Sequence, residues 1–237
     1  MTPVVLLPGM MCDARLFAPQ TAALSPDRAV TLAPVAAHDD VGALAEDVLA
    51  AAPPRFALGG LSMGGIVAME VHRRAPGRVA GLCLMDTNPR AEAPEVAARR
   101  HPQIAKVRAG GLRAVMRDEM KPNYLADGPR QGAVLDLCMA MAEALGPEAF
   151  ERQSRALMRR PDQCDSLRTV AVPTLILCGA HDTLCPLERH ATMAALIPHA
   201  RLAVIDGAGH LPTLERPEDT TAALRAWLAE VDAARRG

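Results

Sequence analysis

The chain has 237 residues, of which 50% are hydrophobic and 22% charged, and its 26 basic and 27 acidic residues give a formal net charge of −1. This length and composition are typical of one globular domain with a large apolar core and argue against a disordered chain. The balanced charge argues against a nucleic-acid-binding surface, which needs an excess or a cluster of basic residues.

Short apolar runs alternate with helical patterns along most of the chain. This alternation is typical of a parallel β-sheet that is covered by helices on both faces, so the predicted fold class is α/β. We predict six strands, at residues 3–7, 29–32, 56–58, 79–85, 174–178 and 202–205.

Two covering helices can be placed by their apolar spacing. Residues 41–49 carry apolar side chains at i, i+3, i+4, i+7 and i+8, with Asp39 or Asp40 available as the N-cap. The last helix is expected to begin at Pro217 and to end in Arg235-Arg236-Gly237, with Trp227 on its apolar face.

The segment from Asn88 to Arg168, called the cap segment below, interrupts the alternation. It contains several helical patterns and no convincing strand, and six prolines divide it into about four predicted helices. These are Pro94, Pro102, Pro122, Pro129, Pro147 and Pro161. We therefore expect a core domain formed by residues 1–87 and 169–237, with residues 88–168 inserted as a helical cap.

Cysteine usage and the N-terminus indicate the compartment. The six cysteines include no C-x-x-C pair and no spacing typical of metal ligands, and Cys83 and Cys178 lie inside apolar runs. The N-terminus MTPVVLLPGMM has no basic segment before its apolar stretch, and no apolar run is as long as a membrane span. We expect a cytoplasmic monomer or homodimer with no membrane span.

The strongest functional motif is Gly60-Leu61-Ser62-Met63-Gly64, which follows a predicted strand and precedes a predicted helix. A serine on a tight turn between a strand and a helix projects its hydroxyl out of the fold, and small neighbours let the backbone turn. The start of the following helix favours developing negative charge. Ser62 is therefore the candidate nucleophile.

A serine hydroxyl needs a base, and His210 is the best-placed of seven histidines. It lies in a glycine-rich loop after the last predicted strand, at the carboxyl ends of the strands, where ligands bind in open α/β sheets. The other histidines that lie in helix or loop patterns, His38, His72, His101, His190 and His199, are interpreted as solvated surface residues.

The acid that orients the histidine should also follow a strand and precede the histidine. Asp182 fits this position, after the strand at 174–178. Asp86 follows the strand at 79–85 and stays open as an alternative, although a turn-forming role is favoured for it.

Acyl transfer also needs donors for an oxyanion. The backbone N–H of Met63, next to the nucleophile, can supply one. The loop after the first strand, Pro8-Gly9-Met10, can supply a second from the N–H of Met10.

The order Ser62, Asp182, His210, with Pro8-Gly9-Met10 upstream and Gly207-Ala208-Gly209-His210-Leu211-Pro212 near the end, resembles the α/β-hydrolase superfamily, in particular its small carboxylesterase and lactonase-like members. The resemblance covers nearly the whole chain. It implies that the cap segment is a lid and that neither a metal nor an organic cofactor is needed. The family commonly has His-Gly where this chain has Pro8-Gly9, and the hairpin that often begins its relatives is missing, which predicts a sheet of about six strands.

The predicted function is hydrolysis of a small-molecule carboxylic ester through an acyl-enzyme. Aromatic residues make up only 2% of the chain, so we expect an aliphatic and Met-lined pocket and a preference for small or aliphatic acyl groups. The candidate lining methionines are Met10, Met63, Met116, Met120, Met139, Met141 and Met158. The alternatives are a lactonase, a thioesterase or a carbon–carbon hydrolase with the same triad, or a ligand-binding protein without catalysis.

Overall fold

The computed structural model describes residues 1–235. Arg236 and Gly237, where the last helix was predicted to end, lie outside this range. Six strands form one sheet in the order β2-β1-β3-β4-β5-β6, and every neighbouring pair is parallel. The strands are β1 Val4–Leu7, β2 Val30–Leu32, β3 Phe56–Leu61, β4 Val79–Met85, β5 Thr174–Gly179 and β6 Arg201–Ile205. The predicted α/β class and the number of strands are confirmed.

The third strand is longer than predicted. β3 continues through Gly59, Gly60 and Leu61, beyond the predicted end at Leu58. The sequence pattern stops at the glycine pair, but β3 lies in the middle of the sheet, and Gly59 pairs with Leu6 of β1 on one side and Cys83 of β4 on the other. Pairing on both sides keeps these glycines extended despite their low strand propensity.

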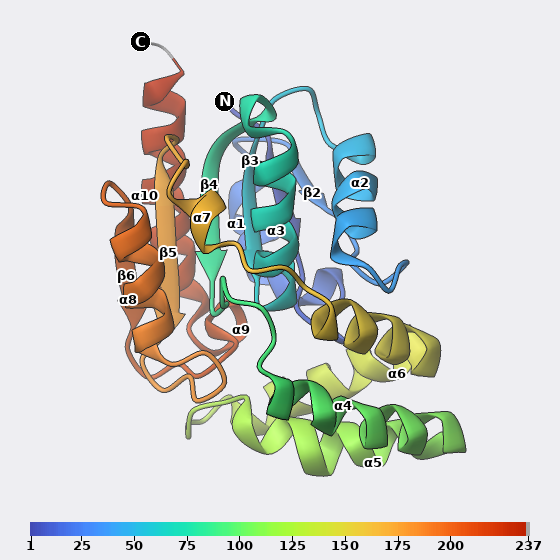
Figure 1. The fold of residues 1–237 in the computed structure, drawn as a ribbon. Helices are drawn as coiled ribbons and strands as arrows, with labels where there is room; N and C mark the ends of the chain where they lie inside the picture. Colours follow the sequence, from blue (N-terminus) through green and yellow to red (C-terminus); the bar gives the residue numbers. More distant parts are fainter. Residues whose placement is uncertain (236–237) are drawn as a thin grey trace.

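The helices pack on both faces of the sheet, as Figure 1 shows. The α-helices are α1 Ala18–Leu24, α2 Val41–Ala51, α3 Met63–Arg74, α4 Pro94–Lys106, α5 Leu112–Ala114, α6 Gln131–Met158, α7 Cys164–Leu167, α8 Leu187–Leu196, α9 Pro212–Glu215 and α10 Pro217–Ala234. Short 3-10 helices are η1 Ala14–Phe17, η2 Pro76–Arg78 and η5 Lys121–Asn123, and π-helical turns are η3 Val107–Gly111 and η4 Val115–Met120.

Alternate residues of each strand enter two separate apolar cores. Val5 and Leu7 of β1 belong to the core beneath α2, α3 and α8, whereas Val4 and Leu6 belong to the core beneath α1 and α10. This alternation follows from the two-residue period of a strand. The second core contains Trp227 of α10, which is fully buried and whose indole N–H donates to the carbonyl oxygen of Pro173 at 3.0 Å.

The two helix predictions can be compared directly with the structure. The N–H of Ala43 donates to Oδ1 of Asp40 at 3.0 Å, so Asp40 rather than Asp39 caps α2. The last helix begins at Pro217, as predicted.

The cap segment contains no strand between residues 88 and 168. Its helices α4, α5 and α6 gather at the end of the sheet where the strands terminate, whereas α7 lies alongside the sheet (Figure 1). One of its prolines, Pro102, lies inside α4 instead of between helices. Pro147 does divide two helical arms, as predicted, because Gly146 before it has a φ of 81° and breaks α6 at a kink. The division of the chain into core and cap domains at residues 88 and 168 stays a prediction.

The two ends of the described chain lie together at the side of the sheet away from the cap segment (Figure 1). The N–H of Thr2 donates to Oδ1 of Asp232 at 2.8 Å, and the guanidinium of Arg28 contacts Oδ2 of the same carboxylate at 3.1 Å. In the described part of the chain, the helices are too short or too polar to cross a bilayer.

Two histidines interpreted as surface residues are buried, which corrects the sequence interpretation. His72 on α3 is 4% exposed, and His190 on α8 is fully buried. Both histidines lie on helices that pack against the sheet. The spacing of apolar residues alone did not reveal that an imidazole occupies part of the helix face that packs on the sheet.

Candidate active site

Ser62 lies on the turn between β3 and α3 with a φ of 54° and a ψ of −115°. A non-glycine residue rarely adopts this conformation, and such backbone strain is found most often at functional sites. Three contacts hold the turn. The N–H of Ser62 donates to the carbonyl oxygen of Met85 at 2.9 Å, and its carbonyl oxygen accepts from the Thr87 hydroxyl at 2.7 Å and from the N–H of Ile66 at 3.2 Å.

The glycines on either side of Ser62 are required by the close approach of the backbone. A Cβ on Gly60 would overlap the carbonyl oxygen of Gly64, and a Cβ on Gly64 would overlap the carbonyl oxygen of Leu7. The motif therefore brings β1, β3 and the start of α3 into direct contact around the serine.

His210 is in contact with both Ser62 and Asp182. Its Nε2 lies 2.9 Å from Oγ of Ser62, and its Nδ1 lies 2.8 Å from Oδ2 of Asp182. Because a carboxylate only accepts hydrogen bonds, Nδ1 carries the proton that it donates to Asp182, and Nε2 is left to accept from the serine hydroxyl. The three side chains predicted from the sequence are thus brought into one hydrogen-bonded chain.

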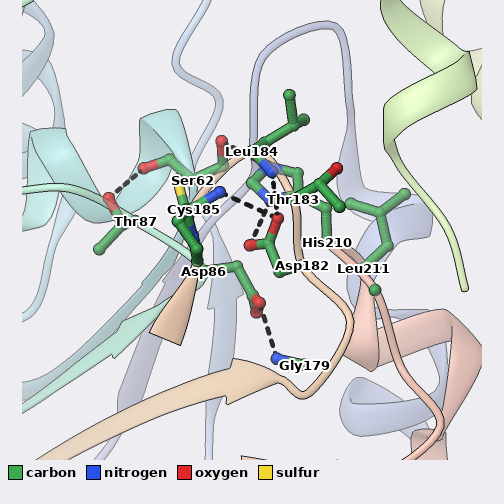
Figure 2. Close-up of polar contacts among 12 residues, drawn as sticks. Ser62, Asp86, Thr87, Gly179, Asp182, Thr183, Leu184, Cys185, His210 and Leu211 are labelled. Atoms are coloured by element: carbon green, nitrogen blue, oxygen red, sulfur yellow. Dashed lines mark hydrogen bonds and ion pairs between the residues drawn. The ribbon is translucent and has the colours of Figure 1, made fainter. Parts of the chain in front are cut away.

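Asp182 lies three residues after β5 and is held by its own turn (Figure 2). Its Oδ1 accepts from the N–H groups of Leu184 at 2.8 Å and Cys185 at 3.0 Å. Burial raises the pKa of this carboxyl, but the hydrogen bond and charge of His210 and the two N–H groups outweigh burial and lower it. Asp182 is therefore a carboxylate at neutral pH.

Asp86 does not contact His210. It follows β4 with a φ of 43°, and its Oδ1 accepts from the N–H of Gly179 at 2.9 Å (Figure 2). Of the two aspartates considered from the sequence, Asp182 is the one that the structure places against the histidine.

The predicted oxyanion donors lie on the two segments that adjoin Ser62. Met63 is the first residue of α3, where backbone N–H groups have no partner within the helix. The N–H of Met10 donates to no group within residues 1–235. Gly9 lies against Ser62, since a Cβ placed on it would be 3.4 Å from the serine Cβ. Whether these two N–H groups bind an oxyanion stays a prediction.

A small cavity of about 20 Å³ lies over Ser62. Its lining residues are Gly9, Met10, Cys12, Leu61, Ser62, Tyr124, His210 and Leu211. Of the seven candidate methionines only Met10 lines it, whereas Met116 and Met141 are buried in the two apolar cores. The only tyrosine of the chain also contributes to the lining, and the expectation of a pocket lined mainly by aliphatic and Met side chains stays a prediction.

The family of the chain follows from its similarity to known proteins. Residues 4–224 match the model of the alpha/beta hydrolase family. The chain is an α/β hydrolase. Pimeloyl-[acyl-carrier protein] methyl ester esterases from Xanthomonas oryzae and from Aromatoleum aromaticum are similar to this hydrolase. The first is 28% identical over 96% of this chain and 95% of its own length, and the second is 33% identical over 68% of each.

Two solved structures share the whole architecture of this α/β hydrolase. An esterase from Thermogutta terrifontis is 31% identical, has a TM-score of 0.90, and is matched over 98% of this chain and 90% of its own. An enol-lactonase from Burkholderia xenovorans is 25% identical, has a TM-score of 0.85, and is matched over 97% and 92%.

Residues that the sequence did not single out hold the two loops of the hydrolase site. Gln153 of α6 is fully buried, and its Oε1 accepts from the N–H of Met11 at 2.9 Å while its Nε2 donates to the carbonyl oxygen of Val35 at 2.9 Å. Met11 has a φ of 55°. The cap segment therefore fixes the loop that carries Met10.

Glu215 of α9 holds the loop that carries the histidine. Its carboxylate accepts from the N–H groups of Gly209, Leu211 and Ala126, each at 2.9 Å. The N–H of His210 donates to the carbonyl oxygen of Tyr124 at 2.7 Å. The sequence shows a glutamate five residues after the candidate base. The role of this glutamate could not be inferred from that spacing, because it depends on three N–H groups that the fold brings together.

One group of side chains in this hydrolase has the composition of a metal site. Single ligand atoms of Asp182, Cys185 and His210 lie within 4.8 Å of one another, and all three residues are buried. Two of these atoms are already paired with each other, and burial raises the pKa of the Cys185 thiol, so that it stays protonated at neutral pH. A metal would therefore have to displace the bond between Asp182 and His210.

Proposed function

We propose that this α/β hydrolase cleaves carboxylic esters through an acyl-enzyme, with Ser62 as nucleophile, His210 as general base and acid, and Asp182 as the residue that orients the imidazole. The observation that carries the proposal is the unbroken chain of hydrogen bonds from Oγ of Ser62 through both ring nitrogens of His210 to Asp182. The esterase relatives support the same chemistry.

In the first half of the reaction, Oγ of Ser62 forms a bond to the ester carbonyl carbon while its proton moves to Nε2 of His210. The carbonyl oxygen becomes an oxyanion, and the N–H groups of Met10 and Met63 are the proposed donors to it. The bond from carbon to the alcohol oxygen then breaks, and His210 returns the proton to the leaving alkoxide. The acyl group stays on Ser62.

In the second half, a water molecule gives a proton to Nε2 and attacks the acyl carbon. When the tetrahedral intermediate collapses, the bond to Oγ breaks and the proton returns from His210 to Ser62. The carboxylic acid is released, and the enzyme regains its starting protonation state.

The proposed substrates have small or aliphatic acyl groups. The cavity over Ser62 has a volume of about 20 Å³, which is the size of a water molecule, and the proposal includes a movement of the residues around it that admits larger acyl groups. Tyr124, from the cap segment, lies beside His210 with ring centroids 5.8 Å apart, which makes the cap segment the proposed moving part. A cytoplasmic location and a monomeric or homodimeric state are also part of this proposal.

Lactone hydrolysis is the second candidate, favoured by the similarity to the enol-lactonase structure. The same steps apply, except that the leaving alcohol remains attached to the acyl chain. A panel of methyl esters from butyrate to octanoate, compared with lactones of the same carbon number, separates the two candidates by kcat/KM.

A phosphonate probe tests the proposed function. It is expected to label Ser62 in the wild-type protein, and Ser62→Ala is expected to lose both labelling and turnover. Ser25→Ala, at an exposed helix end, is the matched control and should behave as wild type. Full ester turnover by the Ser62→Ala variant would refute the proposal.

A further inference from the structure

Asp86 is a buried carboxyl group that the proposed reaction does not use. The residue is fully buried at the end of β4. Its Oδ1 accepts from the N–H of Gly179, but its Oδ2 is also buried and receives no hydrogen bond from residues 1–235. An ionised carboxylate with one unsatisfied oxygen in the protein interior is unfavourable, because its lost hydration is not replaced.

The groups around Asp86 make its negative charge still less favourable. The carboxylates of Asp182 and Glu215 both act on it, and the buried thiols of Cys83, Cys178 and Cys185 lie around it. Two imidazoles are also near, since His210 pairs with Asp182 and His190 accepts from the N–H of Thr87. Within residues 1–235 no arginine, lysine or histidine forms an ion pair with Asp86. Burial and the charge of Asp182 raise the pKa of Asp86 well above its usual value, although the Gly179 N–H works in the opposite direction.

The side chains of Asp86, at the end of β4, and Asp182, after β5, lie near each other (Figure 2). Asp182 must be ionised to pair with the imidazole, and it can accept a further hydrogen bond because its two oxygens offer about four acceptor positions, of which three are used. Two adjacent buried carboxyls are expected to hold one proton between them.

We propose that Asp86 is a positioning residue that stays protonated at neutral pH and donates a hydrogen bond from Oδ2 to the carboxylate of Asp182. This arrangement gives every oxygen of the pair a partner and leaves His210 facing a single negative charge. The hydrogen bond fixes Asp182 from the side opposite its own turn. The positioning role of Asp86 rests on the proposed function, but the protonation state of Asp86 can be measured without any substrate.

Two substitutions separate protonation from mere packing. Asp86→Asn keeps an acceptor for the Gly179 N–H and a donor toward Asp182, so it is expected to retain kcat within about threefold. Asp86→Leu keeps the branching of the side chain but is larger, has neither donor nor acceptor, and is disfavoured at the φ of 43° of this position. It is expected to lower kcat by about 10- to 100-fold with little change in KM, because the lost hydrogen bond is to a charged group. Asp136→Asn, at an exposed position of α6, is the control.

The pH profile gives the decisive kinetic comparison. If Asp86 is neutral, Asp86→Asn replaces one neutral group with another, and the acidic limb of kcat/KM keeps its midpoint. If Asp86 is ionised, the same substitution removes a negative charge beside Asp182 and His210, and the midpoint falls by about one pH unit. A midpoint that falls in this way would overturn the proposal.

Infrared difference spectroscopy of the resting enzyme measures the proton directly. The wild-type protein at pH 7 is expected to show the C=O stretch of a protonated carboxyl group, which is absent from Asp86→Asn and retained in Asp136→Asn. Absence of this band from the wild type would overturn the proposal, even if Asp86→Leu fails to fold. Loss of phosphonate labelling in Ser62→Ala tests the hydrolase function separately, so the two failures can be distinguished.

Discussion

Asp182 accepts three hydrogen bonds, and the one from His210 fixes which ring nitrogen carries the proton. In Asp182→Asn the side-chain amide can donate to Nδ1, which favours the tautomer with the proton on Nε2. That tautomer cannot accept the serine proton, so kcat is expected to fall by about 10,000-fold with the fold intact. Steady-state kinetics and circular dichroism check both parts. Activity within tenfold of wild type would show that Asp182 does not orient the base.

His190 predicts a pH dependence of stability. It is fully buried, its Nε2 accepts from the N–H of Thr87 at 3.2 Å, and burial lowers its pKa to about 4, against the opposing effect of the Pro186 carbonyl. The unfolded chain has a histidine pKa of about 6.5 and binds more protons between pH 6.5 and 4, so stability falls as pH decreases through this window.

Urea unfolding at pH 7.5 and pH 5 measures this effect. The wild-type free energy of unfolding should decrease by about 2 kcal/mol at pH 5 from His190 alone. His190→Gln removes the titration and is expected to reduce the difference between the two pH values, whereas His101→Gln, at an exposed position of α4, should leave it unchanged. An unaltered pH dependence in His190→Gln would contradict the predicted neutral histidine.

At the scale of elements, α6 and the loop after β1 form one unit through Gln153. Gln153→Leu removes the acceptor for the Met11 N–H and the donor to Val35, so the loop that carries Met10 loses its fixed conformation. If the Met10 N–H stabilises the oxyanion, kcat is expected to fall by about 10- to 100-fold while KM changes little.

The matched control for this element is Gln103→Leu, on α4 of the same cap segment. It should keep wild-type kinetics. A Gln153→Leu variant that raises KM alone would show that α6 acts on substrate binding and not on the oxyanion loop.

Elements defined by local pattern could be predicted from the sequence. The apolar runs of β1 and β4 and the period of α2 and α10 lie in contiguous residues, and their buried faces follow directly from that spacing. The break at Gly146-Pro147 is a local signal of the same kind. The end of β3 could not be predicted, because pairing on both sides of the strand is a tertiary effect that overrides the low strand propensity of glycine.

At the scale of the molecule, Glu70 joins the core to the end of the cap segment. Its carboxylate contacts Arg73 and Arg74 of α3 at 2.6 Å and accepts from the Gln163 side chain at 2.7 Å. Burial raises its pKa, but these three partners outweigh burial and lower the pKa to about 2. The resulting stability is present above pH 4.5 and is lost as pH falls from about 4.5 to 2.

Glu70→Gln is expected to lower the free energy of unfolding by about 2 kcal/mol at pH 7 and to flatten the acid dependence below pH 4.5. Acid titration followed by circular dichroism measures it. The exposed Glu95→Gln on α4 should unfold like the wild type. An acid transition that is the same in Glu70→Gln and wild type would refute this assignment.

The candidate site shows where sequence reasoning ends. Ser62, Asp182 and His210 could be placed because each follows a strand, and the carboxyl ends of parallel strands meet at one edge of a sheet. Gln153 could not be assigned, since the groups that it binds come from distant loops, and Glu215 could not be assigned, since its role in joining the histidine loop to the cap segment depends on the distant N–H of Ala126. The sequence favoured Asp182 over Asp86, and the fold places Asp182 against His210.

The contact between Thr2 and Asp232 brings the beginning and the end of the described chain to the side of the sheet opposite Ser62. An affinity tag or a fluorescent fusion partner at either end would therefore project away from the candidate active site. A short linker between the two ends is expected to allow circular permutation, with new ends opened in a surface loop, while Ser62, Asp182 and His210 keep their places at the strand ends.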